Sequence, residues 1–393
     1  TYENARMWAP MIKEKVADRV MPPWHINRTV GIQEFKNDSG LTAEQIETIV
    51  AWVESGMPAG DPSQLPEPVE WKSDHEYWAL EDEEGWGPPD LIIESPPFTV
   101  PANSGDQWWE PDAAIADVVD TELTEGRWIR AVETRPADSE SGYVFHHANT
   151  SLFRLDDNER RGGLSSSAVG KRTDMYPEDA GKLVRPGDQI HFSMHLFPIG
   201  REVVDAQIQI GVWLYPEGED PKFATNDEIL FNSGESRDLG LPRYTDLLIP
   251  PHGYQMLRGN FVLEQNARVH SIRGHMHLRG GYQMMEAIYP DGRWEIINKL
   301  NWDHSWHTLF LYEDHVAPLF PTGTVLLLSS TFDNTAANPH NPDPNRSVRF
   351  GRPTTDEMGF GFLSYTQVEP QRFVAGEEIP AELAGRSVVG GGN

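Results

Sequence analysis

The feature that most constrains the fold is an alternation of apolar and polar side chains that begins at about Phe98. Runs of this kind include 128–133, 207–213 and 324–328, and a repeat of two places alternate side chains on one face of a strand. Turn sequences such as Arg185-Pro186-Gly187-Asp188 separate the runs. We therefore predict a mainly β protein of two tandem antiparallel β-sandwich (jelly-roll-like) domains, with a small helical N-terminal segment.

Changes in composition along the 393 residues predict the domain boundaries, because a chain of this length exceeds one compact core. Gly, Glu, Asp and Pro cluster from Pro216 to Pro221, between two strand-rich blocks. The predicted units are a helical segment 1–60, an extended linker 61–97 rich in Pro, Trp and acidic residues, a first sandwich 98–217, a second sandwich 218–375 and a tail 376–393.

Two helices are predicted within the first 60 residues. Met7, Met11, Val16 and Val20 recur at helical spacing before a Pro-Pro pair. A second helix begins after Thr42, which is able to cap it, and stops at Gly56.

The charge balance excludes some partners. The chain carries 61 acidic and 32 basic side chains, a formal net charge of -29, and such a surface repels nucleic acid and anionic lipid. No apolar run approaches about 18 residues, so no transmembrane span is predicted. The first residue is Thr1, so we expect either a removed leader or a chain that begins inside a longer protein.

The chain contains no cysteine and 14 histidines. Disulfides and thiolate ligands are therefore excluded, and His, carboxylate or Met must hold any transition metal. The grouping of the histidines is then the relevant signal.

His275 and His277 are two residues apart in a predicted strand. Both imidazoles therefore point to one face and are able to reach one ion. The alternative interpretation is a pair of ordinary surface or core histidines, because the motif is short.

His146 and His147 are adjacent. In a regular strand they would face opposite ways, so joint binding of one ion requires a bulge or a strand end. His191 and His195 share a face of a later strand, and either of them is a candidate third ligand.

Met358 follows Asp356-Glu357. A buried Met is usually a core residue. Together with two imidazoles, its thioether suits a site that cycles between Cu(I) and Cu(II), because sulfur favours the softer Cu(I).

The order of these motifs resembles that of the copper type II, ascorbate-dependent monooxygenases, the family of peptidylglycine α-hydroxylating monooxygenase and dopamine β-monooxygenase. The motifs are His146-His147, the lone His195, His275-x-His277 and Asp356-Glu357-Met358, and the resemblance covers about 98–370. The stretches 275–280 and 331–339 look like the bacterial members.

The resemblance implies two copper ions per chain. His146, His147 and His195 would hold the copper that supplies electrons, and His275, His277 and Met358 would hold the copper that binds O2. In the family, ascorbate reduces both ions and a C–H bond of the substrate is hydroxylated.

The chain also departs from the family. It lacks the disulfides of the animal enzymes. Arg273 matches the Arg that holds a substrate carboxylate in the peptide-amidating branch, whereas Phe360 and Phe362 stand where that branch has polar side chains. A small, more apolar substrate is therefore expected instead of a peptide C-terminus.

A second resemblance lies in the first 60 residues. Met21-Pro22-Pro23-Trp24-His25, followed by the helix to Gly56, looks like the end of a cytochrome c domain, in which the Met would be the distal haem ligand. The chain has no Cys-x-x-Cys-His, so haem is not expected on these residues. Either a haem-binding part lies upstream, or the helices remain as a cytochrome c-like remnant that packs on the sandwich.

The other histidines are expected to be structural. His304 and His307, which lie among Trp302 and Trp306, are interpreted as lining a cleft or the core. Ordinary surface or structural roles are assigned to His25, His75, His252, His315 and His340.

The expected function is that of a copper-dependent monooxygenase acting on a small organic substrate with O2 and an ascorbate-like reductant. The alternative is a non-catalytic copper-binding or electron-transfer subunit of a larger assembly, with a partner protein or an upstream cytochrome domain. A periplasmic or extracellular location is expected, because thiols do not sequester copper there.

Overall fold

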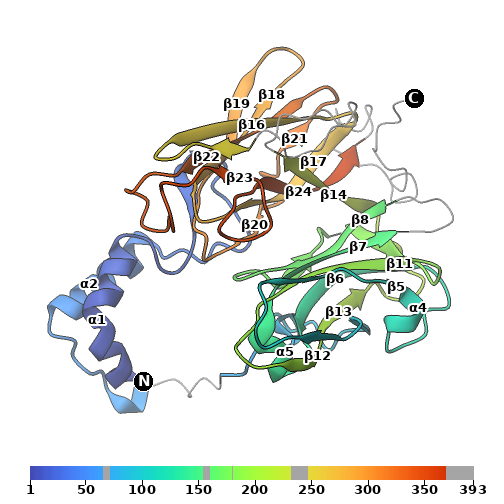
Figure 1. The fold of residues 1–393 in the computed structure, drawn as a ribbon, viewed down its shortest axis with the longest axis horizontal. Helices are drawn as coiled ribbons and strands as arrows, with labels where there is room; N and C mark the ends of the chain where they lie inside the picture. Colours follow the sequence, from blue (N-terminus) through green and yellow to red (C-terminus); the bar gives the residue numbers. More distant parts are fainter. Residues whose placement is uncertain (65–70, 154–159, 179, 232–246, 369–393) are drawn as a thin grey trace.

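A computed structural model of the chain describes residues 1–64, 71–153, 160–178, 180–231 and 247–368. Strands hold 44% of the chain and helices 13%, so the protein is mainly β, as predicted. Figure 1 shows two stacked β-sandwiches, with a pair of helices beside them. The predicted tail, 376–393, lies outside the described residues.

The first sandwich packs one half of a long sheet against a smaller sheet of order β4-β11-β7-β8, in which β5 also pairs with β11. On the long sheet its strands run β2-β13-β6-β10, with β9 beside β6. The elements are α3 (Ala79–Asp82), β2 (Leu91–Glu94), β3 (Phe98–Val100), β4 (Gln107–Trp109), β5 (Asp112–Ala114), α4 (Ile115–Val118), β6 (Arg127–Pro136), α5 (Ser139–Val144), β7 (Phe145–Phe153), β8 (Arg160–Ser167), β9 (Thr173–Met175), β10 (Ala180–Val184), β11 (Gln189–Leu196), β12 (Val203–Ala206) and β13 (Ile208–Leu214).

The second sandwich packs the other half of the long sheet, β14-β24-β17-β20 with β21 beside β17, against a sheet of order β1-β19-β18-β22-β16. The elements are β14 (Phe223–Phe231), β15 (Leu248–Ile249), β16 (Tyr254–Val262), β17 (Asn266–Met276), β18 (Gly280–Ile288), β19 (Trp294–Asn301), β20 (Phe310–Leu311), β21 (Leu319–Phe320), β22 (Val325–Asp333), β23 (Val348–Arg349) and β24 (Gly359–Val368).

One sheet runs through both sandwiches. Strand β10 of the first pairs in parallel with β14 of the second, through Ala180 with Phe223 and Gly181 with Ala224. The chain crosses between the sandwiches from Leu214 to Phe223, the stretch that contains Pro216 and Pro221. Each sandwich nevertheless keeps a separate apolar core.

The N-terminal segment belongs with the second sandwich. It contains α1 (Tyr2–Ala17), β1 (Ile26–Gly31), α2 (Ala43–Glu54) and a short 3-10 helix at Pro62–Gln64. Strand β1 joins the sheet through Ile26, which faces Leu300 of β19. Trp24, Ile26 and Phe35 are buried in the second core, so this part of the chain completes the sandwich.

The two N-terminal helices begin and end close to their predicted positions. Thr42 caps α2 in a full capping box with Gln45. Most apolar residues of α1 are on the surface, including Met7 at 71% exposure and Trp8 at 57%. None of the helices in the described residues is long and apolar enough to cross a membrane.

The segment 71–97, expected to be an extended linker, is integrated into the first sandwich. Strand β2 pairs with β13, and Leu80 is fully buried. The buried Glu133 carboxylate accepts the backbone N–H groups of Ala79 and Leu80 at 2.8 and 3.0 Å and pairs with Arg172. The described part of the segment is therefore anchored by a carboxylate inside the sheet, because a buried charge requires such partners.

Candidate metal centres

The first histidine cluster lies on two paired strands of the smaller sheet. His195 of β11 faces His147 of β7, and the next pair joins Leu196 to Phe145, so the register skips His146. This irregularity is the bulge that joint binding by His146 and His147 requires, because it turns two adjacent side chains to one side. All three imidazoles therefore converge, with their ligand atoms within 4.8 Å of one another.

The imidazoles of this cluster meet through their Nδ1 atoms. His146 Nδ1 lies 3.0 Å from Nδ1 of His147 and 3.2 Å from Nδ1 of His195. Two nitrogens that bind one ion at about 2.0–2.1 Å in tetrahedral geometry lie about 3.3 Å apart. The observed spacing therefore fits a first-row transition metal held by three nitrogens.

Burial favours the neutral form of these imidazoles. It lowers the pKa of His195 to about 4 and that of His147 well below its usual range, and neighbouring imidazoles add to both shifts. The pKa of His146 is also lowered by burial. Neutral imidazole is the form that binds metal, so the cluster is ready to bind at neutral pH.

Two further side chains hold His195. Trp108 stacks on its ring at 4.3 Å between centroids, with 9° between the planes. The Nε2 atom of His195 lies 3.3 Å from an Asp106 oxygen. Binding through Nδ1 would leave a proton on Nε2, facing that carboxylate. His191, the alternative third ligand, is outside the cluster and bonds to Asp112 at 2.7 Å.

The second cluster lies where β17 and β24 end their pairing. The last pair is Met276 with Gly359, so the next facing residues are His277 and Met358. Both are almost fully buried, at 9% and 8% exposure. His275 shares their face, and its ring centroid is 5.3 Å from that of His277. The strand register therefore places Met358 opposite His277, at the strand end that carries the two imidazoles.

A buried carboxylate joins the strands that carry these ligands. One Glu357 oxygen accepts the backbone N–H groups of His277 and Met358, and the other accepts that of Arg279 at 3.0 Å. The Arg279 side chain bonds in turn to Asn334 at 2.8 Å. Burial raises the pKa of Glu357 to about 7, although these N–H groups lower it. Glu357 therefore fixes the separation of His277 and Met358.

Arg273 is placed two residues before His275 on the same face, as the sequence predicts. It is 6% exposed, and its guanidinium lies 4.2 Å from the centre of the Phe362 ring. Phe360 stacks on His275, at 5.8 Å and 15°. The face beside the second cluster therefore combines two aromatic rings with the Arg273 cation, on which the Asp174 and Asp227 carboxylates act.

The two clusters are close enough to affect one another electrostatically. Burial lowers the pKa of His277 to about 4, and His195 and His146 of the first cluster add to this shift. His147 likewise adds to the lowered pKa of His275, after burial and nearer imidazoles. Electrostatic effects between the clusters mean that a charge added to one is felt at the other.

His307 is the site residue that sequence reasoning missed. Its Nδ1 lies 3.2 Å from Nδ1 of His275, and burial lowers its pKa to about 3. The sequence signal was weak, because 32 residues separate the two histidines. His304, from the same loop, instead lies with its ring 4.3 Å from that of His340, outside both clusters.

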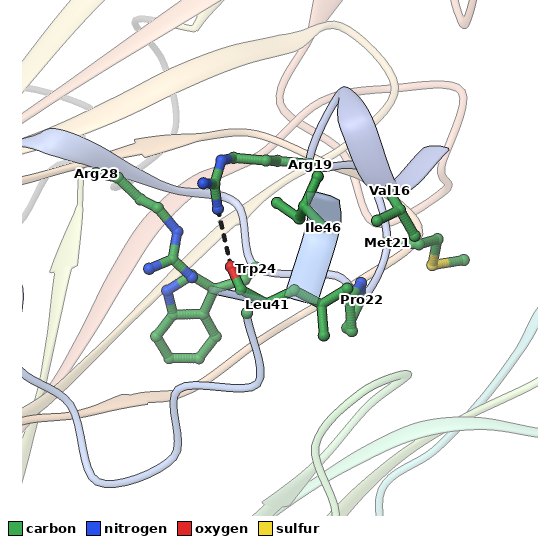
Figure 2. Close-up of a pocket in the computed structure, with 9 residues that line it drawn as sticks. Val16, Arg19, Met21, Pro22, Trp24, Arg28, Leu41 and Ile46 are labelled. Atoms are coloured by element: carbon green, nitrogen blue, oxygen red, sulfur yellow. Dashed lines mark hydrogen bonds between the residues drawn. The ribbon is translucent and has the colours of Figure 1, made fainter. Parts of the chain in front are cut away.

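The N-terminal segment encloses a small hollow (Figure 2). Met21, which the cytochrome resemblance marks as a haem ligand, lines it together with Pro22 and Ile46. Arg19 closes one side by bonding to the Leu41 carbonyl at 3.0 Å. None of its lining residues belongs to either histidine cluster.

No model of a known protein family matches this chain. No curated protein matches it either. Among solved structures, it is similar to the major capsid protein P2 of bacteriophage PM2, with 8% identity over 62% of this chain and 96% of that one, at a TM-score of 0.25. Vicilin from hazelnut, Corylus avellana, matches with 10% identity over 72% and 76%, at a TM-score of 0.17. A putative alpha-L-fucosidase from Bacteroides ovatus matches with 10% identity over 74% and 38%, at 0.18. Scores this low carry no argument about function.

Proposed function

We propose that this protein is a copper-dependent monooxygenase that hydroxylates a C–H bond of a small organic substrate, using O2 and an ascorbate-like reductant. The observation that supports it is the presence of two thiolate-free donor sets, one in each sandwich, that affect one another electrostatically. One contains His146, His147 and His195. The other combines His275 and His277 with Met358.

The chemistry of the donors favours copper. Imidazole binds both copper oxidation states, and a thioether in the second set shifts the balance toward Cu(I), the state that reacts with O2. When bound, copper would supply O2 activation and hydrogen removal at the second cluster and a further electron from the first. The overall reaction consumes O2, two electrons and two protons for each C–H bond hydroxylated, and it releases one water.

The residues of this chain would position the substrate and exclude water. Arg273 offers a buried positive charge, and its pKa, lowered to about 10 by burial, keeps it protonated at neutral pH. Phe360 and Phe362 supply an apolar wall. A substrate with an apolar body and an anionic group beyond the reacting carbon would match this surface.

The test is the copper content of variants. We expect two coppers in the reconstituted protein, and about one after His275→Ala or His147→Ala, because each removes a ligand of a different site. His191→Ala is the matched control, since His191 is on the same strand as His195 but outside the cluster, and it should retain both. A His275→Ala protein that retains both coppers would refute the proposal.

A second candidate is a non-catalytic copper-binding or electron-transfer subunit. The specific observation in its favour is the apolar surface of α1, where Met7, Trp8 and Met11 are more than half exposed at 71%, 57% and 52%, a feature typical of docking surfaces. Ascorbate-driven O2 consumption across a panel of small organic acids and aromatics separates the two. A copper-loaded protein that neither consumes O2 nor forms peroxide supports the subunit.

The same proposal places the protein in the periplasm or at the cell surface. A chain without cysteine cannot lose copper to its own thiolates, and it avoids copper-catalysed thiol oxidation. Fractionation of the native host tests this placement, and recovery of the chain in the cytosol would contradict it.

A further inference from the structure

The loop 302–309 brings an additional imidazole to the second cluster. The rings of His307 and His275 are 5.0 Å apart and inclined at 50°. Their Nδ1 atoms are 3.2 Å apart, which is within hydrogen-bond range and is also the spacing of two ligands of one ion. His307 is therefore in direct contact with a proposed copper ligand and is part of the second site.

The neighbouring ligand shows how an imidazole of this cluster is oriented. His277 Nδ1 lies 3.3 Å from the backbone carbonyl oxygen of Asp356. A carbonyl only accepts, so His277 carries its proton on Nδ1 and presents the Nε2 lone pair. This is the usual arrangement of a metal-binding histidine, whose other ring nitrogen donates to a fixed acceptor.

In the part of the chain that the structure describes, no carbonyl or carboxylate takes the corresponding place at His275. Among the described residues, the hydrogen-bonding partner of its ring is His307 Nδ1. Two neutral imidazoles that share this contact hold one proton between them. If His275 donates, its Nε2 lone pair is free for the ion, as in His277. If His307 donates, the proton of His275 is on Nε2, and this nitrogen then has no lone pair with which to bind a metal ion.

We propose that His307 is a positioning residue that accepts the Nδ1–H of His275 and so directs the His275 Nε2 lone pair toward the metal. This inference rests on the proposed function, because it presumes a metal at the second cluster. His307 thereby has the role for His275 that the Asp356 carbonyl has for His277.

The loop that carries His307 is held by the first sandwich. The backbone N–H of His307 donates to the Val169 carbonyl at 2.8 Å. The absence of a side chain at Gly170 leaves room for Trp306, because a Cβ there would lie 3.0 Å from the indole. On its other side, Trp302 Nε1 donates to the His277 carbonyl at 2.9 Å. The acceptor for a second-sandwich ligand is therefore fixed from across the domain contact.

Two variants of similar size separate the roles of His307. His307→Gln retains an oxygen that is able to accept from His275, and His307→Phe retains ring volume without an acceptor. Both are made in the His147→Ala background, so that only the copper of the second cluster is measured. The readouts are Cu(I) affinity, by competition with a chromogenic chelator, and the number of imidazoles per copper, by X-ray absorption.

We expect His307→Phe to weaken Cu(I) binding about 10- to 100-fold, the usual effect of losing such a partner. His307→Gln should stay close to the His147→Ala parent, with the same two imidazoles per copper. Equal affinity in the parent and both variants would overturn the inference. Equal weakening in both, with one imidazole fewer, would also overturn it, because His307 would then be a ligand.

Failure of the proposed function gives a different result. In that case the His147→Ala parent would bind no copper at the second cluster, or would keep it after His275→Ala. A parent that binds one copper, lost on His275→Ala, leaves the His307 variants to decide the positioning role alone.

Discussion

The two histidine clusters differ in what holds their ligands in place. In the first, all three imidazoles are on neighbouring strands, and a bulge at His146 turns them together. In the second, the ligands are at a strand end and depend on Glu357, Arg279 and His307, none of which is among the proposed ligands. Two paired strands with a bulge fix these side chains through the backbone, whereas a strand end requires a surrounding hydrogen-bond network. The second cluster should therefore be more sensitive to changes outside its ligand set.

The largest expected effect is that of Glu357→Ala. Three buried backbone N–H groups lose their acceptor, and each unpaired group costs about 1–3 kcal/mol. We expect a loss of at least about 3 kcal/mol in the free energy of unfolding, measured by urea denaturation of the metal-free protein. The copper of the second cluster should be lost and that of the first retained.

Glu286→Ala is the matched control for this variant. Glu286 is equally buried, at 2% exposure, and accepts from Ser329 and Trp294 in the opposite sheet of the same sandwich. It should lower stability while both coppers remain. Loss of the second copper in both variants would mean that general destabilisation, and not the carboxylate at the ligands, is responsible.

Acid should weaken the second sandwich through His270. Burial lowers its pKa from 6.5 to about 3, and Nε2 contacts the Thr366 hydroxyl at 2.9 Å. Below pH 6.5 the unfolded chain binds a proton that the folded chain does not. The free energy of unfolding therefore decreases as the pH is lowered. This group accounts for about 3 kcal/mol between pH 6.5 and 4.

His270→Gln tests this prediction, because glutamine is able to bond to Thr366 without titrating in this range. Urea midpoints of the metal-free proteins from pH 8 to 4 should diverge below pH 6.5, with the variant losing less stability. Parallel pH profiles would show that the acid sensitivity arises elsewhere.

The first cluster should respond to one carboxylate only. Asp106→Asn removes the charge that faces His195 Nε2 at 3.3 Å, and we expect about 10-fold weaker copper binding at this site alone. Competition titrations with a Cu(I) chelator measure it. Asp112→Asn is the control and should have no effect, because Asp112 bonds to His191, which is outside the cluster. A 100-fold loss would mean that this cluster depends on groups outside its ligand set as strongly as the second cluster does.

The smallest effect concerns the coupling between the sandwiches. Gly170 has φ +85°, and a Cβ there would contact Trp306, whereas Gly162 has φ +88° and open space around it. Alanine at either position adds similar backbone strain, about 1–2 kcal/mol. Only Gly170→Ala should also weaken copper binding at the second cluster, by less than about tenfold. Equal copper affinity in the two variants would contradict the coupling of the two sandwiches through the 302–309 loop.

Much of the fold could be predicted from the sequence, because alternation of period two is a local property. The strands after Phe98 and the capping box at Thr42 follow from residues close together in the chain. The placement of 1–60 and 71–97 could not be predicted in this way. Ile26 pairs with Leu300, and the backbone at Leu80 bonds to Glu133, and nothing local indicates partners so distant in sequence.

For the candidate site, the sequence by itself determined which types of side chain are able to bind a metal ion and which local backbone irregularity is required to bring two of them together. Without cysteine, only imidazole, thioether and carboxylate remain, and the adjacent pair His146-His147 requires a bulge to act together. Tertiary structure decided between His195 and His191, which the residue pattern left open, and it alone brought His307 to His275. The physical reason is that strand register and loop contacts depend on packing between distant segments, which a one-dimensional pattern does not contain.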